Sequence, residues 1–163
     1  MKFNAILHPV DFSEDPQYAL EVAHSLARDH HAKLVLLTTV DPPPTSVLPT
    51  SDMLIASASL SGEYLQLAAR QLKAIADRIT DIPVESVALI ALPGDAIIEL
   101  AQKYDIDLIV MGTHGRTGLS HLFMGSIAEY VLSRAPCPVL TIRPGTSPHL
   151  SKVSETTLIA SKS

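Results

Sequence analysis

The stretch GTHGRTGLSHLFMGS, residues 112–126, lies between a short apolar run, DLIVM at residues 107–111, and an amphipathic run at residues 127–135. The DLIVM run is continuously apolar, rich in branched residues and too short for a surface helix. These features are typical of a parallel strand that is buried on both faces. The glycines begin where this strand is expected to end. The sequence therefore predicts a strand, a glycine-containing loop and a helix in direct succession.

The glycines of this loop suit a bound phosphate. Gly112 and Gly115 allow positive φ and let the backbone approach a ligand without an intervening Cβ. Gly125 and Ser126 stand at the start of the next helix, whose first N–H groups are unpaired and whose dipole is positive at that end. A structural alternative stays open, because Ser126 and Glu129 form the S-x-x-E pattern of a capping box, which needs no ligand. That alternative leaves the two earlier glycines unexplained.

The spacing Gly-x2-Gly-x9-Gly-Ser differs from two common phosphate loops. The chain has no Gly-Lys pair, which excludes a Walker A loop, and the dinucleotide fingerprint needs three close glycines after the first strand. The sequence instead resembles the universal stress protein family, specifically its ATP-binding branch, whose phosphate loop has this spacing. The resemblance rests on GTHGRTGLSHLFMGSIAEYVLSRAPCPVLTIR (residues 112–143) and HPVDFS (residues 8–13), and it covers about residues 1–144.

Composition limits the class of protein. A chain of 163 residues fits one domain with one sizeable core, and 47% hydrophobic with only 4% aromatic residues makes that core aliphatic. The net charge is −5 and no Lys/Arg cluster occurs, so nucleic acid and anionic membranes are not expected partners. The single Cys137 excludes an intrachain disulfide and is expected to be a packing residue. Without a signal-peptide-like or membrane-spanning run, the expected location is cytoplasmic.

Buried strands alternate with amphipathic helices along the chain. Strands are expected at residues 3–7, 33–40, 84–92, 107–111 and 139–142. Helices are expected to begin at residues 13–16, between residues 52 and 61, after Pro93 and at residue 127, the last one with Ile127, Ala128, Val131 and Leu132 facing inward. This alternation predicts a single-domain α/β fold, a parallel sheet with helices on both faces. The family resemblance implies the doubly wound strand order 3-2-1-4-5.

Two segments lie outside this pattern. Residues 41–50 contain four prolines, which favour a semi-extended loop over the strand tips, either a lid or a variable insertion. Residues 145–163 are rich in Ser and Thr and have little to bury, so we expect a flexible polar tail after a nucleotide-binding domain at residues 1–144.

In doubly wound sheets the ligand lies beyond the carboxyl ends of the strands, where the strand order reverses. With the order 3-2-1-4-5, the reversal falls between the first and fourth strands. The first is followed by Pro9, Val10 and Asp11, and the fourth ends at Met111 and Gly112. The two motif-bearing segments are therefore expected to meet across one crevice.

The resemblance assigns a place in this crevice to individual residues. The phosphate side takes Gly112, Gly115, Gly125, Ser126, Ile127 and Ala128. The base and ribose side takes Pro9, Val10, Asp11, Thr39, Val40 and Met111. His114 and Arg116 lie inside the loop, within reach of phosphate oxygens, although for Arg116 a solvated loop cation is an open alternative.

Asp11 implies a cation if a triphosphate binds. A carboxylate beside phosphates is repelled by them unless a divalent ion lies between, so bound ATP is expected to carry Mg²⁺ or Mn²⁺. Two alternatives remain for Asp11, namely binding a ribose hydroxyl and capping the first helix. His8 and His121 are expected to be structural, and the histidines at positions 24, 30 and 31 form no complete metal set.

The expected function is adenine-nucleotide binding, of ATP, ADP or AMP, by a stress-response protein that acts as a signalling or protective module with at most slow hydrolysis. The alternative is a nucleotide hydrolase or transferase that uses His114 and metal-bound Asp11, because His114 has a pKa range suited to proton transfer near neutrality. A receiver domain is excluded, because the third strand ends in Ala-Leu-Pro-Gly at residues 91–94 and a receiver needs an aspartate after that strand.

The resemblance also implies a homodimer. The strand at residues 139–142 would lie at the edge of the sheet, and Val139, Leu140 and Ile142 are poor residues for an exposed edge. Antiparallel pairing with the same strand of a second copy would cover them.

Overall fold

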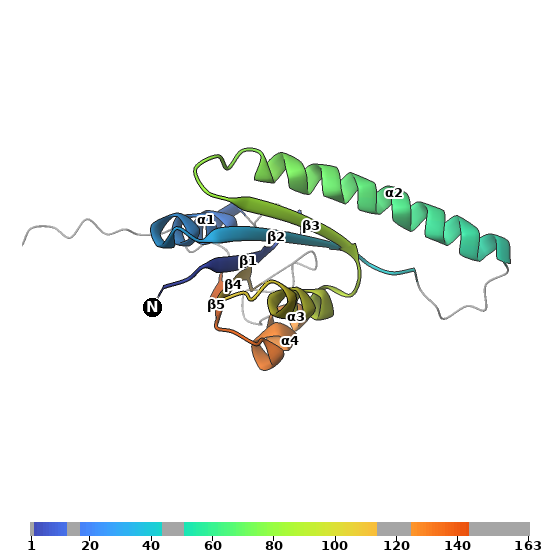
Figure 1. Cartoon of the computed structure of the whole chain (residues 1–163). Coiled ribbons are helices and arrows are strands. Elements are labelled where there is room, and N and C mark those ends of the chain that lie inside the picture. The colour runs from blue at the N-terminus through green and yellow to red at the C-terminus, as the bar shows by residue number, and fades with distance from the viewer. Residues whose placement is uncertain (1, 13–16, 44–50, 114–124, 144–163) are drawn as a thin grey trace, which may run out of the picture.

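A computed structural model describes residues 2–12, 17–43, 51–113 and 125–143 (Figure 1). Strands and helices alternate along these residues. The elements are β1 (Ala5–Pro9), α1 (Gln17–His30), β2 (Lys33–Val40), α2 (Ser51–Ala76), β3 (Val84–Ile90), α3 (Pro93–Lys103), β4 (Leu108–Gly112), α4 (Ser126–Arg134) and β5 (Val139–Ile142). Within the described ranges, no helix is both long enough and apolar enough to cross a membrane.

The strands form one parallel sheet in the order β3-β2-β1-β4-β5. This confirms the predicted α/β fold with the order 3-2-1-4-5, and it places β5 at an edge. Two helices cover each face, since α1 and α2 lie on one side of the sheet and α3 and α4 on the other (Figure 1). The three inner strands are therefore buried on both sides, which explains why their sequences are continuously apolar.

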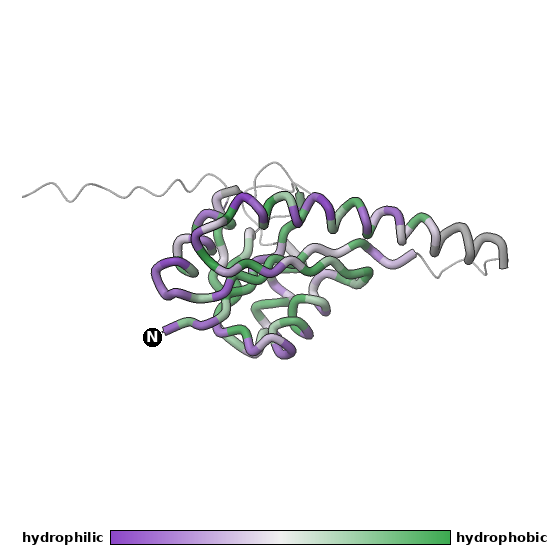
Figure 2. The backbone as a smooth tube through the Cα atoms, turned by 45° about the horizontal axis from the view of Figure 1, so that its top comes forward, coloured by the Kyte–Doolittle hydropathy of each residue, from purple (hydrophilic) through white to green (hydrophobic). Residues whose placement is uncertain are grey.

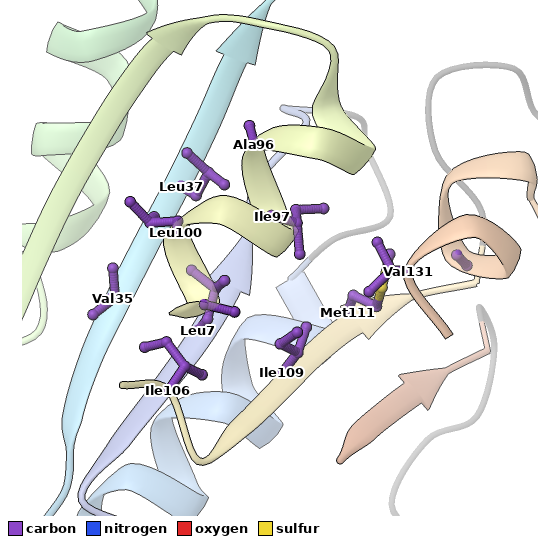
Figure 3. Packing of buried hydrophobic residues seen from close by; sticks show 12 residues of the cluster. Leu7, Val35, Leu37, Ala96, Ile97, Leu100, Ile106, Ile109, Met111 and Val131 are labelled. Carbon is purple, nitrogen blue, oxygen red and sulfur yellow. The ribbon is translucent and has the colours of Figure 1, made fainter. Parts of the chain in front are cut away.

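The core is divided by the sheet into two clusters, because successive side chains of a strand point to opposite faces. Leu7 of β1 packs with α3 and α4, where Ile97 and Val131 are fully buried (Figure 3). The preceding residue, Ile6, packs with α1 and α2 on the other face. Both clusters are aliphatic, as the composition predicted.

Element boundaries differ from the predictions by one or two residues. β1 spans Ala5–Pro9 where residues 3–7 were expected, because the carboxylate of Asp107 accepts the N–H groups of Asn4 and Ala5 at 2.6 and 3.1 Å before the strand ladder begins. β3 ends at Ile90, two residues early, because Ile90 pairs with Val40, the last residue of its neighbour β2. α2 begins one residue before its expected window.

The amphipathic helices expose more apolar surface than the sequence indicated. In α4, Ala128 and Val131 are buried, whereas Ile127 and Leu132 are 39% and 44% exposed, so the prediction that all four face inward was wrong for two of them. In α2, Leu60, Tyr64 and Leu67 are more than half exposed. In Figure 2 hydrophobic and hydrophilic residues alternate along the coloured part of α2, and Figure 1 shows that the amino-terminal part of this helix extends beyond the strands.

Gly94 is required where α3 and α4 pack together. A Cβ at this position would lie 2.7 Å from Cδ1 of the Tyr130 ring, and that ring is held by a hydrogen bond from its hydroxyl to Asp95 and by Arg134, 4.2 Å above its centroid. We expect Gly94→Ala to lower the free energy of unfolding by about 1–3 kcal/mol in urea titrations, the usual cost of overpacking.

Gly62→Ala is the matched control, because Gly62 lies within α2 and a Cβ there has no neighbour within 4 Å. This variant should raise the free energy of unfolding by about 0.5–1 kcal/mol through helix propensity. Equal shifts of the same sign in the two variants would contradict the packing argument.

Candidate functional site

β1 and β4 are neighbouring strands at the middle of the sheet, and the chain leaves their carboxyl ends toward opposite faces. Leu7 of β1 pairs with Ile109 of β4, and the two strands end at Pro9 and Gly112. The helix that follows β1 covers one face of the sheet and the helix that follows β4 covers the other. This divergence is where a doubly wound sheet is expected to leave a crevice.

The start of α4 is tied to the end of β4. Thr113, which is buried, donates its N–H to the carbonyl of Ile142 at 2.8 Å, and its own carbonyl accepts the N–H of Gly125 at 2.8 Å. Gly125 is the N-cap residue, with φ −64° and ψ 147°. The first turn of α4 therefore stands directly beside the carboxyl end of β4.

The capping-box alternative is wrong in this structure. Ser126 is the first residue inside α4 and Gly125 occupies the N-cap, with no side-chain cap hydrogen bond. A glycine has no side chain with which to accept the N–H groups of the first turn. Those N–H groups have no partner inside the helix either, so they are donors for a ligand at this end.

Four of the residues assigned to the phosphate side, Gly125, Ser126, Ile127 and Ala128, form this first turn. The side chains of Ser126 and Ile127 are exposed and that of Ala128 is buried against the core. The N–H of Gly125 is donated to Thr113, so this turn offers an anion the backbone N–H groups of Ser126, Ile127 and Ala128. This arrangement fits an anion beside the positive end of the helix dipole.

The residues assigned to the base side follow β1 and end β2. Val10 is buried and donates its N–H to the carbonyl of Leu37 at 2.7 Å, which holds the chain close to β2 beyond the end of β1. Thr39 and Val40 are the last two residues of β2, and Asp11 is half-buried. The described residues of both predicted halves of the site therefore lie at the carboxyl ends of the strands.

A hollow of about 360 Å³ lies between the end of β2, the chain after β1, and α2. Its lining residues are Phe12, Val40, Asp41, Tyr64, Leu67, Ala68 and Gln71. Of the predicted site residues that the structure describes, Val40 is the one that lines it. The four residues from α2 were missed, because a helix's spacing in the sequence does not show which strand ends it will overhang.

Met111 belongs to the core. Its side chain is 5% exposed and packs in the cluster under α3 and α4, near Val131 (Figure 3). The assignment of Met111 to the base side remains a prediction. Because its side chain is in the core, only its backbone would be available at the end of the strand.

His8 is buried in β1 next to the crevice. Its Nδ1 lies 2.8 Å from the carbonyl oxygen of Val110, and since a carbonyl can only accept, Nδ1 carries the proton and Nε2 is a bare acceptor. Burial lowers the pKa of His8 to about 4, against the opposing influence of the Val110 hydrogen bond and the Asp11 charge. His8 is therefore neutral near pH 7, which agrees with the structural role expected for it.

Several predicted residues lie outside the described residues. These are His114, Gly115, Arg116 and His121, together with most of the proline-rich segment and the tail at residues 145–163. Their roles remain predictions. Among the residues that the structure describes, no group of three His, Cys, Asp or Glu side chains could hold a metal ion.

Comparison with known proteins identifies relatives along nearly the whole chain. Residues 2–143 match the model of the universal stress protein family. A universal stress protein of Methanocaldococcus jannaschii, MJ0531, is 33% identical over 141 residues, which cover 86% of this chain and 82% of the relative.

Solved structures share the fold. The universal stress protein UspA from Lactobacillus plantarum superimposes with a TM-score of 0.72 at 28% identity, covering 88% of this chain and 99% of that one. A universal stress protein from Archaeoglobus fulgidus in complex with dAMP has a TM-score of 0.56 at 23% identity and covers 87% and 99% of the two chains.

Proposed function

The chain belongs to the universal stress protein family, and we propose that it binds an adenine nucleotide, ATP, ADP or AMP, at the carboxyl ends of β1, β2 and β4. Occupancy of this site would serve as a signal or a protective state in the stress response, with hydrolysis slow at most. The observation that carries the proposal is the first turn of α4, whose N-cap Gly125 has no side chain to cap it and which is held beside the end of β4 by the hydrogen bond from Gly125 to Thr113.

The width of the site suits a nucleotide. Adjacent strands lie about 4.8 Å apart, so the end of β2 and the end of β4, with β1 between them, are separated by roughly 10 Å. A nucleotide separates its base from its phosphates by a comparable span. The structure with dAMP supports the choice of an adenine nucleotide, because it shares this fold.

Nothing among the described residues favours hydrolysis. Among the residues that the structure describes, His8 is the histidine of β1, and it is neutral at pH 7 with its Nδ1 proton donated to the carbonyl of Val110. A general base must be able to take a proton from an attacking water, and burial opposes the positive charge that His8 would then carry. Binding without rapid turnover is therefore the function that we propose.

A divalent cation fits beside Asp11. Carboxylate oxygen is a ligand that Mg²⁺ and Mn²⁺ accept, and Asp11 follows β1 at the crevice. Since the described residues supply no group of three ligands, the phosphates and water would complete the coordination. Asp11 and the phosphate oxygens would hold the cation, which would neutralise the charge of a triphosphate.

Isothermal titration of nucleotide-stripped protein tests both proposals. Wild-type protein should bind Mg-ATP, and replacing Mg²⁺ by EDTA should weaken ATP binding about tenfold, because about 1.4 kcal/mol of carboxylate–phosphate repulsion is then uncompensated. Asp11→Asn should remove most of this difference.

Asp29→Asn is the matched control, since this exposed carboxylate lies in the last turn of α1 and should not affect the metal dependence. If the wild type binds no adenine nucleotide at millimolar concentration, the proposed function is wrong. If Asp11→Asn retains the full Mg²⁺ dependence, the cation lies elsewhere.

We also propose a homodimer through β5. This strand is at a sheet edge, its Leu140 is 37% exposed, and Ile127 and Leu132 on the adjoining α4 are exposed as well. An unpaired edge strand together with exposed large apolar side chains favours association with a second copy.

A further inference from the structure

The hollow beside β2 is lined by side chains that leave large apolar surface uncovered. Tyr64 and Leu67 are 60% and 52% exposed and lie on one face of α2, and Val40 lines the hollow from the end of β2. Its volume of about 360 Å³ falls in the range of small-molecule sites, about 300–1,000 Å³. A ligand with flat apolar faces would cover these side chains.

Phe12 gives a second, independent sign that this hollow is a ligand site. Its φ is 56°, in the left-handed region that a bulky side chain rarely occupies, and it lines the hollow directly after Asp11. Backbone strain of this kind persists where surrounding packing enforces it, and it is found preferentially at ligand-binding positions. Phe12 packs against the core cluster under α1 and α2, which holds it in place.

The polar groups of the hollow favour a base over phosphate. Its charged lining residue is Asp41, whose carboxylate repels phosphates but accepts hydrogen bonds from an amino group. Gln71 adds a carboxamide, which presents a donor and an acceptor side by side. Adenine offers the complementary pair, the N6 amino donor beside the N7 acceptor, whereas guanine presents two acceptors, O6 and N7, on the same edge.

We propose that α2 forms the outer wall of the base subsite, with Tyr64 and Leu67 covering the ring faces and Gln71 selecting adenine over guanine. This inference rests on the proposed nucleotide function and adds the residues that set base selectivity. The roughly 10 Å between the ends of β2 and β4 lets a base in this hollow belong to the same nucleotide whose phosphates meet α4.

Gln71→Leu tests the selectivity directly, because leucine keeps a side chain of similar size and removes the carboxamide. The ratio of ATP to GTP affinity, measured by isothermal titration, should fall about tenfold, within the discrimination that one such bidentate contact supplies. Gln66→Leu is the control, since Gln66 is exposed on α2, does not line the hollow, and lies about 140° around the helix from Gln71. Its affinity ratio should stay at the wild-type value.

A spectroscopic test locates the base independently. The chain has no tryptophan, so Tyr64→Trp introduces a single reporter in the wall of the hollow, and Leu60→Trp places one a helical turn away, outside it. ATP should change the fluorescence of the Tyr64→Trp protein and leave that of the Leu60→Trp protein nearly unchanged.

The outcomes separate this inference from the proposed function. ATP binding with an unchanged ATP-to-GTP ratio in Gln71→Leu, or with no preference for ATP in the wild type, would overturn the role of α2 and leave nucleotide binding intact. Equal fluorescence responses from the two reporters would also overturn it. Failure of the wild type to bind either nucleotide would overturn both.

Discussion

Ser126→Pro is expected to weaken ATP binding about 10- to 100-fold, the loss of one hydrogen bond to a charged group worth about 1.5–3 kcal/mol. Proline removes the backbone N–H of the first residue of α4, which is a proposed phosphate donor. It should not disturb the helix, because proline is favoured at this position and its fixed φ is already helical. The preceding Gly125, with φ −64° and ψ 147°, has the extended geometry that a following proline requires.

Ser126→Ala is the control that separates backbone from side chain. It removes the hydroxyl and keeps the N–H, so ATP affinity should change less than about threefold, since the proposed contact is made by the backbone. Both variants should unfold at nearly the wild-type temperature. If Ser126→Ala loses as much affinity as Ser126→Pro, the hydroxyl is the ligand contact, and if neither loses affinity, the phosphates do not meet α4.

The layered fold was predictable because its signals are local. A short window of sequence is enough to recognise a continuous apolar run such as Lys33–Val40. It is also enough to recognise the change to helical spacing after each run. The strand order was inferred from the family resemblance, and the two-sided burial of the inner strands agrees with it. Strand ends were less predictable. The carboxylate that binds the N–H groups at the start of β1, for example, belongs to Asp107, about a hundred residues away.

The parts of the site formed by segments that follow each other directly in the sequence were predictable. The parts that depend on packing between distant elements were not. Glycine and serine are both favoured at helix N-caps, so the sequence could not decide between Gly125 and Ser126. Apolar spacing in α4 showed four candidates for its inner face, and of these four Ala128 and Val131 are buried in the cluster shared with α3. Tyr64 and Gln71 reach the site because α2 overhangs the end of β2, which is a tertiary arrangement.

Acid should destabilise this protein through His8 before the carboxylates protonate. The pKa of His8 is about 4 in the folded state because burial disfavours the imidazolium, and its ordinary value of 6.5 applies in the unfolded chain. Between these two values the unfolded state binds more protons, so the free energy of unfolding falls as the pH falls from about 6.5 to 4 and is fully retained above 7. The whole difference corresponds to about 3 kcal/mol, of which about 2 kcal/mol should be lost between pH 7 and pH 4.5.

His8→Asn should abolish most of this acid sensitivity, because an asparagine amide can still donate to the carbonyl of Val110 from the same δ position but does not titrate. The void left by the smaller side chain should cost some stability at pH 7, so the informative quantity is the change between pH 7 and pH 4.5 in urea titrations. His31→Asn is the control, since His31 is exposed with φ 55°, a conformation that asparagine tolerates, and this variant should retain the wild-type loss. An acid-induced loss as large in His8→Asn as in the wild type would show that the buried imidazole is not the group that senses pH. A loss confined to proteins that keep His8 would show that the buried histidine of β1 sets the acid limit of the fold.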